Sequence, residues 1–303
     1  MNTRLKSELL LGFATAIWGG TYAIIKTGLN DISPVLFVAI RFFLAFLFFL
    51  PALLRSGREL STATLQAGLV LGLTMFGGYA LLTAGLVLTS SGRSGLITYS
   101  FALFVPFLQV LLLRKKVRTV NLLGLFMVIF GMYVFTSAPS SPGTGWNRGD
   151  ILTFLAAISY AFNIVYLDRY SRRHSPSVLT GLQFAVMTVL AVLYVLFFEA
   201  PFINFTFSFF LSLFYLSVLG SVIAISLMNR YQKDTTPVRA VIIYALEPVL
   251  AVVSGWLFLG EKIGIYGMIG GAVIIGGVLL SEVLGIYLDK RNTGNSEEKK
   301  VHL

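Results

Sequence analysis

The stretch SPVLFVAIRFFLAFLFFLPALL, residues 33–54, decides the class of fold. It contains a single charged side chain, Arg41, among leucines, phenylalanines and other apolar residues. A helix rises about 1.5 Å per residue, so this stretch is long enough to cross a hydrocarbon core of about 30 Å. It therefore predicts a transmembrane helix.

The remainder of the chain has the same apolar character. Of its 303 residues, 56% are hydrophobic and 12% are charged, and the mean hydropathy is +0.84. Soluble proteins carry about 25% charged residues, so this composition excludes a soluble enzyme. Ten crossings of roughly 20 residues each would leave only short connections and no room for a second folded domain.

The chain lacks the residues that much metal and covalent chemistry requires. It has no cysteine, which excludes disulfides and thiolate sites. Its two histidines, His174 and His302, lie outside the apolar runs. We therefore expect no metal site and no cofactor.

Apolar runs bounded by charge, glycine or proline predict an all-α polytopic membrane protein with ten transmembrane helices. The predicted spans cover residues 7–27, 33–54, 65–88, 93–113, 119–137, 149–168, 176–198, 208–229, 237–259 and 263–286. An even number of spans places both termini on the same side of the membrane.

The lysines and arginines gather at alternate ends of these spans. Of the 23 basic residues, 18 fall on the side that holds both termini. Four fall toward the other face, namely Lys26, Arg93, Arg148 and Lys262. By the positive-inside rule, both termini are predicted to lie in the cytoplasm, with the chain in the cell membrane. The net charge of +10 is then a topology signal, and no nucleic-acid partner is expected.

The two halves of the chain share landmarks at a fixed spacing, which predicts an internal duplication. At an offset of 142 residues, the matching pairs are Ser33-Pro34 with Ser175-Pro176, Gly78 with Gly220, Pro106 with Pro248, and Trp18 with Tyr160. Beyond the second proline the offset grows to 146, which predicts four additional residues around Phe258–Glu261. Because five spans are an odd number, successive copies must insert in opposite orientations, as in the inverted repeats of alternating-access transporters.

These landmarks divide the chain into two inverted five-helix repeats. The first repeat is predicted over residues 1–137 and the second over residues 149–286. A linker rich in proline, glycine and serine, residues 138–148, joins them on the non-cytoplasmic side. Residues 287–303 are predicted to form a cytoplasmic tail.

Several motifs, taken in order along the chain, resemble one family of transporters. They are WGGTYAIIK at 18–26, RFFLA at 41–45, TSSGR at 89–93, TTPVRA at 235–240, LEPV at 246–249, LGE at 259–261 and the glycines from Gly270 to Gly277. The set resembles EamA-type members of the drug/metabolite transporter superfamily. That resemblance implies ten helices with both termini inside, a central cavity built mainly by helices one to four and six to nine, and peripheral helices five and ten.

The chain departs from this pattern in one place. The Gly-Glu pair after span nine has no counterpart after span four, where Arg114, Lys115 and Lys116 stand. No acidic role is therefore carried over to the first half.

Ionisable side chains inside a bilayer are costly, so they face a cavity or a partner. Glu247 is the only carboxylate in the middle of a predicted span, and it stands next to Pro248. It serves either as a proton-coupling group or partner of a substrate amine, or as a structural group that caps backbone donors or pairs with Arg41. Arg41 holds either a substrate carboxylate or a structural counter-charge; the resemblance favours structure, because it places an arginine here across varied substrates. Lys26 is expected to snorkel to the outer interface.

Aromatic side chains are the next candidates for a substrate path. Trp18, Tyr22 and Lys26 follow one another at four-residue spacing on one helix face, and Trp18 and Tyr160 lie near the centre of the predicted symmetry. Ordinary packing is the alternative interpretation. Further candidate substrate-binding residues with polar tips are Tyr79, Tyr99, Asn163 and Tyr244. The helix-interrupting prolines Pro106 and Pro248 centre the predicted site between spans four and nine.

The sequence therefore predicts a secondary, ATP-independent transporter that exports small metabolites such as amino acids by alternating access, with proton coupling through Glu247 as a hypothesis. No phosphate-binding loop is present. The expected partners are a small-molecule substrate, the lipid bilayer and, along helices five and ten, a second copy of the chain. The alternatives are a membrane-embedded enzyme, which would need a nucleophile–base pair or a metal site, and a receptor or structural subunit, which would need a larger docking surface.

Overall fold

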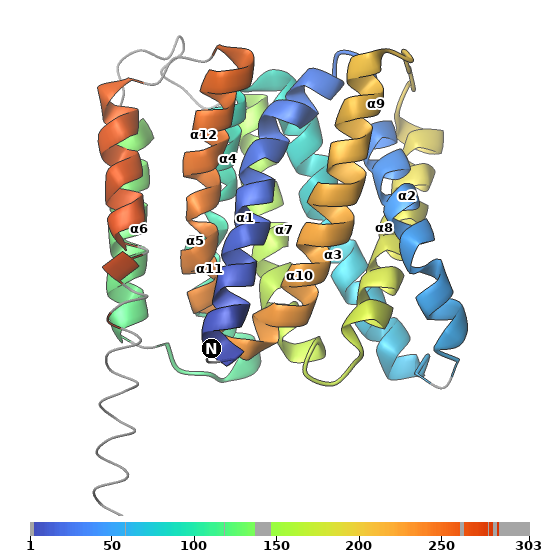
Figure 1. Cartoon of the computed structure of the whole chain (residues 1–303), viewed down its shortest axis with the longest axis horizontal. Coiled ribbons are helices and arrows are strands. Elements are labelled where there is room, and N and C mark those ends of the chain that lie inside the picture. The colour runs from blue at the N-terminus through green and yellow to red at the C-terminus, as the bar shows by residue number, and fades with distance from the viewer. Residues whose placement is uncertain are drawn as a thin grey trace, which may run out of the picture.

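The computed structural model describes residues 3–57, 59–117, 119–136, 147–260, 264–277, 279–280 and 284. This part of the chain is built from helices (Figure 1), which confirms the all-helical prediction. The elements are α1 Thr3–Gly28, α2 Pro34–Arg55, α3 Thr62–Leu88, α4 Ser91–Thr98, α5 Phe101–Leu113, α6 Thr119–Thr136, α7 Arg148–Tyr170, α8 Pro176–Phe198, α9 Phe207–Phe214, the π-helix η1 Tyr215–Ile223, α10 Ala224–Tyr231, the 3₁₀ turn η2 Gln232–Asp234, α11 Pro237–Tyr244 and α12 Leu246–Leu259. A further helix covers Ile265–Gly277.

Eight helical segments are long and apolar enough to cross a bilayer. They are Arg4–Gly28, Pro34–Arg55, Thr62–Leu88, Ser91–Leu113, Arg148–Tyr170, Pro176–Phe198, Phe207–Asp234 and Pro237–Leu259. Two shorter apolar helices, Asn121–Gly131 and Ile265–Gly277, lie where the sequence predicts spans five and ten. The predicted tail and all of the predicted linker except residues 147 and 148 lie outside the described residues.

Two of the membrane-crossing segments are broken near their middle. The helices α4 and α5 are interrupted at Tyr99 and the residue after it, and α11 and α12 meet at Ala245. A proline ring clashes with the carbonyl four residues before it, so Pro248 accounts for a break that directly follows Tyr244. Pro106 does not account for the first break in this way, because it lies inside α5.

The two broken segments match one another at an offset of 146 residues throughout. Their shared landmarks are the hydroxyl N-caps Ser90 and Thr236, the breaks at Tyr99 and Ala245, and the left-handed C-caps Arg114 and Gly260. The φ and ψ angles at the breaks are −63° and −10° in the first segment and −61° and −16° in the second. The predicted equivalence of Pro106 and Pro248, which are 142 apart, is therefore wrong, and no additional turn lies at the end of span nine.

The four additional residues are instead inserted between Gly220 and Thr236. The offset of 142 still holds at Gly78 and Gly220, which make reciprocal contacts. A Cβ at Gly78 would stand 2.3 Å from Cε1 of Tyr160, and the Gly220 carbonyl accepts a hydrogen bond from Trp18 Nε1 at 3.0 Å. Between Gly220 and Thr236 the chain completes the π-helix, forms α10 and ends in a 3₁₀ turn. A π-helix accommodates extra residues within a continuous helix.

Helices from the two halves of the chain interleave (Figure 1). The helix α3 packs along α7 and α8, α2 packs along α8, and α1 packs along α12 and α10. Small residues permit the close approach: a Cβ at Gly19 would stand 2.2 Å from Leu250 Cβ, and one at Gly72 would stand 2.4 Å from Val186 Cβ. Large apolar side chains such as Phe48 point outward, which suits a surface in contact with lipid.

The helix α6 packs against the helix Ile265–Gly277 through glycines. A Cβ at Gly131 would stand 2.8 Å from the carbonyl oxygen of Gly270, and one at Gly277 would stand 2.9 Å from that of Gly124. The contact is reciprocal, because both pairs of counterparts are 146 residues apart. These two helices lie together at one edge of the molecule (Figure 1).

We predict that Gly131→Ala destabilises the protein, because the new methyl group would overlap backbone atoms that cannot move alone. Overpacking of this kind costs about 1–3 kcal/mol. The matched control is Gly57→Ala, where a Cβ would meet no atom within 4 Å. Thermal unfolding of the purified protein in detergent should give a lower midpoint for Gly131→Ala only. Equal midpoints for both variants would show that the glycine contact does not constrain the two helices.

Candidate functional site

A cavity lies between the two broken segments and the helices α1, α3, α7 and α10. Its empty volume is about 580 Å³, which includes the open space at its mouth. Its lining residues are Trp18, Thr21, Tyr22, Ile25, Met75, Tyr79, Leu82, Thr98, Phe101, Tyr160, Asn163, Ile164, Met228, Tyr244 and Glu247. Among the described residues, no group of three histidine, aspartate or glutamate side chains is placed to hold a metal ion.

Four of the predicted aromatic residues form two ring pairs in the cavity wall. Trp18 and Tyr244 meet edge to face with ring centroids 5.8 Å apart, and Tyr79 and Tyr160 do so at 5.7 Å. The indole N–H of Trp18 is bonded to the Gly220 carbonyl, which fixes the ring. Each pair joins helices that are distant in sequence, so the cavity depends on the interleaved packing.

Glu247 lies in the first turn of α12, directly after the second break. Its Oε1 accepts a hydrogen bond from the Tyr22 hydroxyl at 2.8 Å. The side chain remains partly exposed, and it lines the cavity. The sequence places Tyr22 on the Trp18 stripe but gives no signal that it contacts Glu247, because the two residues are 225 positions apart.

Arg41 neither lines the cavity nor pairs with Glu247. Its Nε donates to Ser221 Oγ at 2.7 Å. Its guanidinium carbon stands 4.7 Å from the ring centroid of Tyr79 and 5.1 Å from that of Phe42, which are cation–π distances. The Arg41–Glu247 pair considered from the sequence is therefore wrong, and Arg41 is only 3% exposed.

Two other predicted residues use their polar groups to join helices. Tyr99 does not line the cavity, and its hydroxyl donates to the carbonyl of Val241 at 2.7 Å. Asn163 does line the cavity, but its amide nitrogen donates to the Leu71 carbonyl and to Thr74 Oγ1, each at 3.0 Å. Both residues therefore support the walls of the cavity.

Lys26 has a protein partner instead of reaching only to water. Its ammonium group donates to the carbonyl of Thr89, the residue that follows α3. A cation at a helix C-terminus interacts favourably with the helix dipole. The stripe predicted from the sequence is therefore divided: Trp18 and Tyr22 line the cavity, whereas Lys26 caps α3.

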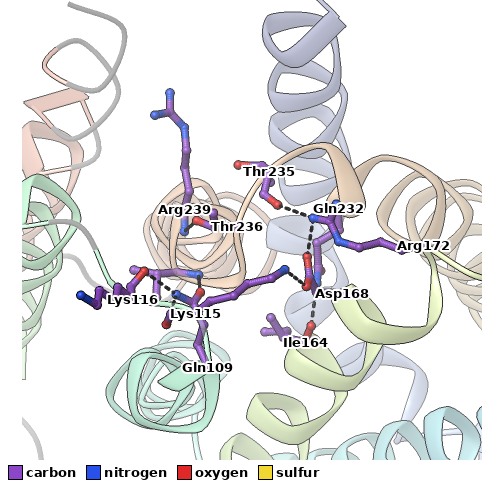
Figure 2. A network of polar contacts seen from close by, with 11 residues as sticks. Gln109, Lys115, Lys116, Ile164, Asp168, Arg172, Gln232, Thr235, Thr236 and Arg239 are labelled. Atoms are coloured by element: carbon purple, nitrogen blue, oxygen red, sulfur yellow. Dashed lines mark hydrogen bonds and ion pairs between the residues drawn. The ribbon is translucent and has the colours of Figure 1, made fainter. Parts of the chain in front are cut away.

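A polar network lies at the end of the molecule that holds the N-terminus (Figure 2). The buried carboxylate of Asp168 accepts hydrogen bonds from Lys115 and, at 2.9 Å, from Arg172. Arg172 also reaches the carbonyl of Thr235 at 3.4 Å. This network joins the ends of α5 and α7 to the turn before α11.

Gln232 connects this network to the cavity. Its amide nitrogen donates to the carbonyl of Ile164 at 2.7 Å, and its amide oxygen accepts from the Tyr244 hydroxyl at 3.1 Å. Since Ile164 and Tyr244 both line the cavity, Gln232 is bonded to two residues of its wall.

Two ion pairs with buried carboxylates escaped the sequence analysis. Arg239 Nε stands 2.5 Å from Glu8 Oε1, and Arg93 Nη2 stands 2.7 Å from Asp150 Oδ2. Each pair ties the first helix of one half to the broken segment of the other half. The sequence does contain a signal that the two pairs are equivalent. The two carboxylates are 142 residues apart and the two arginines are 146 apart, and these are the offsets that relate the two halves. Apolar lining residues such as Met75 give no signal, because any membrane helix contains similar side chains.

Comparison with known proteins identifies similar sequences over nearly the whole chain. The model of the EamA-like transporter family matches twice, at residues 5–137 and at residues 147–283. An uncharacterized transporter of Archaeoglobus fulgidus is 31% identical over 249 residues, which cover 82% of this chain and 76% of the relative. The uncharacterized inner membrane transporter YedA of Escherichia coli is 27% identical over 281 residues, which cover 90% of this chain and 89% of the relative.

Another relative has a more specific description. A protein of Salmonella typhimurium described as a probable amino-acid metabolite efflux pump is 24% identical over 292 residues, which cover 91% of this chain and 94% of the relative. A solved structure, described as the crystal structure of a protein, superimposes with a TM-score of 0.75 at 21% identity and covers 94% of this chain and 99% of its own. That likeness concerns the fold alone.

We predict that two tyrosine-to-phenylalanine variants differ in stability although the chemical change is the same. Tyr99→Phe removes the bond to the Val241 carbonyl, and a net loss of about 0.5–1.5 kcal/mol is expected. Tyr160→Phe should change stability little, because no described residue is hydrogen-bonded to the Tyr160 hydroxyl. Thermal unfolding in detergent measures both. A midpoint for Tyr99→Phe as high as that of Tyr160→Phe would contradict the assigned role.

Proposed function

Because the chain belongs to the EamA-like transporter family and is a membrane transporter, we propose that it is a secondary transporter that exports small metabolites such as amino acids by alternating access. One observation carries this proposal: a cavity with a carboxylate in its lining lies where two membrane-crossing segments are broken. Discontinuous helices in corresponding positions mark the binding sites of secondary transporters. The description of the Salmonella relative as an amino-acid metabolite efflux pump favours export and this class of substrate.

We also propose ten membrane-spanning helices in two inverted repeats, residues 1–137 and 149–286, with a linker at 138–148 and a cytoplasmic tail at 287–303. The two matches to the family model support the duplication. The reciprocal contacts support the inversion, because an axis in the membrane plane exchanges counterparts. The ion pair Glu8–Arg239 has its counterpart in Asp150–Arg93, and the Gly131 contact has its counterpart at Gly277.

The proposed orientation places both termini in the cytoplasm. The N-terminus lies at the same end of the molecule as the connections after α2, α5 and α7 (Figure 1), and basic residues gather there. The positive-inside rule assigns that end to the cytoplasm. The relative from Escherichia coli is described as an inner membrane protein, which agrees with a location in the cell membrane.

Alternating access requires a barrier on each side of the substrate that opens in turn. We propose that the Lys26–Thr89 contact belongs to the outer barrier and that the Arg172–Thr235 contact belongs to the inner barrier. Thr89 and Thr235 are 146 residues apart, and each follows the third membrane-crossing segment of its half. In both cases a cation at the end of the first segment of the same half binds the free carbonyl. The two acceptor carbonyls are therefore counterparts at opposite ends of the cavity, whereas the two cations are not, because Lys26 corresponds to Asp168 at the offset of 142 that relates the first segments.

We predict opposite effects of Lys26→Gln and Arg172→Gln on access to the cavity. The chain has no cysteine, so Thr98→Cys places a single thiol in the cavity wall, and no other thiol can react with the label. Loss of a contact worth about 1 kcal/mol should shift the barrier equilibrium about fivefold. A membrane-impermeant maleimide should then label the thiol faster from the outside in Lys26→Gln and faster from the cytoplasm in Arg172→Gln.

Two single-cysteine variants control for sidedness in that experiment. Gly57→Cys, in the connection between α2 and α3, should react only from the cytoplasm, and Phe205→Cys, before α9, only from the outside. Faster labelling from the same face in both barrier variants, or unchanged labelling in both, would contradict the two-barrier arrangement.

We propose that Glu247 couples transport to a proton gradient. A carboxyl group that binds either a proton or a substrate, but not both at once, exchanges one for the other across the membrane. The other ionisable groups that line the cavity are tyrosine hydroxyls: Tyr22 on α1, Tyr79 on α3, Tyr160 on α7 and Tyr244 on α11. Glu247 is therefore the acid in the lining best suited to this exchange at physiological pH.

The transport test begins with an untargeted comparison of metabolites in the medium of cells that produce the protein, its Glu247→Gln variant or neither. A compound enriched by the unmodified protein is then loaded into proteoliposomes with an imposed pH gradient. We predict that external acidification accelerates release through the unmodified protein and leaves release through Glu247→Gln unchanged. Glu59→Gln, an exposed carboxylate in a connection, is the matched control and should retain the response. A pH response that survives in Glu247→Gln would overturn the coupling role.

A further inference from the structure

The side chains that line the cavity include one carboxylate and no basic residue. Glu247 is the only acidic residue, and no lysine, arginine or histidine belongs to the lining. Arg41 does not belong to the lining: its Nε is bonded to Ser221, its guanidinium is packed on the ring of Tyr79, and its buried Nη2 has no hydrogen-bond partner among the described residues. An anionic ligand would thus face a carboxylate without a cation to receive it, whereas a cationic ligand would find its counter-charge.

Glu247 also differs in its partner from the buried carboxylates of the described membrane-crossing helices. Glu8, Asp150 and Asp168 each form an ion pair with arginine or lysine. Glu247 has only the neutral hydroxyl of Tyr22. A charged carboxylate at this depth is costly without a cationic partner. A cationic ligand would supply the partner that the Glu247 carboxylate lacks.

Aromatic rings surround the space next to this carboxylate. The polar atoms of Trp18, Tyr22 and Tyr244 are bonded to Gly220, Glu247 and Gln232, so these bonds hold the residues in place at their ring edges. Trp18 and Tyr244 also meet edge to face, which occupies one ring face of that pair. A positive group near aromatic faces gains roughly 0.5–2 kcal/mol from the ring quadrupole. The combination of one carboxylate and several fixed rings is typical of sites that bind an ammonium group.

The counterparts of these residues form an apolar region in the same cavity. At the offset of 146, the counterpart of Glu247 is Phe101, and at the offset of 142, the counterpart of Tyr22 is Ile164. Both belong to the lining. The bonded pair Glu247–Tyr22, which joins the two halves, thus corresponds to the apolar residues Phe101 and Ile164, which also come from the two halves. Under the proposed two-fold axis, the cavity has a polar end and an apolar end.

We infer that the substrate is a small amphipathic cation, with an ammonium group that binds Glu247 between the rings and an apolar body that lies against Phe101 and Ile164. This inference rests on the proposed transport function and specifies the class of its substrate. Primary amines with an aromatic or aliphatic body fit this description, and acidic metabolites do not.

The test measures binding of three probes of similar shape to the purified protein by isothermal titration calorimetry. 2-Phenylethylamine carries the positive charge, 2-phenylethanol is neutral and phenylacetate is negative. The amine should bind at least about tenfold more tightly than the alcohol, because it gains both a charge-assisted bond and ring contacts. Methylamine, which has the charge without the body, should bind more weakly than 2-phenylethylamine.

Variants separate the two ends of the cavity. In Glu247→Gln the preference for the amine over the alcohol should fall to about one, while Glu247→Asp and the exposed control Glu59→Gln should retain it. Phe101→Ala should weaken the binding of 2-phenylethylamine and of 2-phenylethanol equally, so the ratio of their affinities should stay unchanged. This variant keeps the inference testable if Glu247→Gln does not fold.

Three results would overturn the inference: equal binding of the amine and the alcohol, tighter binding of phenylacetate, or no saturable binding of the amine. Its failure is distinguishable from failure of the proposed function. Proteoliposomes that release an anionic or neutral metabolite would leave the transporter intact and exclude the cationic substrate. Tight amine binding without any release of the amine would leave the site intact and contradict transport.

Discussion

The architecture depends on one constraint, the need of every backbone polar group inside a bilayer for a hydrogen-bond partner. A helix broken in mid-membrane leaves such groups without partners, and this protein breaks two. The breaks are placed against each other: α4 packs on α12, α5 packs on α11, and the Tyr99 hydroxyl binds the carbonyl of Val241 just before the second break. Gly95 permits the approach, because a Cβ there would stand 2.9 Å from that of Ala251. The cavity exists because the two breaks support each other while their flanking side chains line it.

The buried charges divide into those that hold the helices together and one that does not. The pairs Glu8–Arg239 and Asp150–Arg93 each link the first helix of one half to the broken segment of the other. Removing one partner from such a pair leaves an uncompensated buried charge, so these contacts are costly to break. Helices joined in this way are expected to move together. Glu247 lacks a cationic partner and is held by a single neutral hydroxyl, so in the proposed transport cycle it is the carboxylate whose partner changes.

Much of the fold could be predicted from the sequence, because hydropathy and charge are local signals. Eight predicted spans coincide with long apolar helices, and the two shorter helices lie where spans five and ten were expected. The predicted register of the second half was wrong between Gly220 and the end of span nine, since two conspicuous prolines fell at the offset of 142, and it was correct again from Gly270 to Gly277. The motifs TSSGRS and TTPVRA, at 89–94 and 235–240, are 146 residues apart and carried the correct register. Their hydroxyl caps and arginines occupy matching positions in the structure.

The candidate site was predictable to a lesser extent, for a physical reason. Glu247 and Trp18 stand out because charge and large aromatic rings are rare in the middle of a span, and both line the cavity. Which hydroxyl reaches Glu247, and whether Arg41 does, depends on how helices far apart in sequence are rotated about their axes. Tyr22 meets Glu247 and Arg41 meets Ser221 because α1, α2, η1 and α12 pack in one particular way. Hydropathy does not specify such contacts between distant helices.

The differences between the two halves, more than their similarity, distinguish the two ends of the cavity from each other. Exact symmetry would make the inward-open and outward-open states equal in energy and the two ends of the cavity identical. The lining departs from symmetry at the positions that bear on binding: Glu247 corresponds to Phe101, and Tyr22 corresponds to Ile164. A ligand can shift a conformational equilibrium only by its differential affinity for the two states. In the proposed alternating access of two inverted repeats, exchanging the states is equivalent to exchanging the halves, so a carboxylate present in only one half meets different surroundings in the two states. Occupancy of Glu247 by a proton or by a substrate can therefore bias the two states differently, which coupled transport requires.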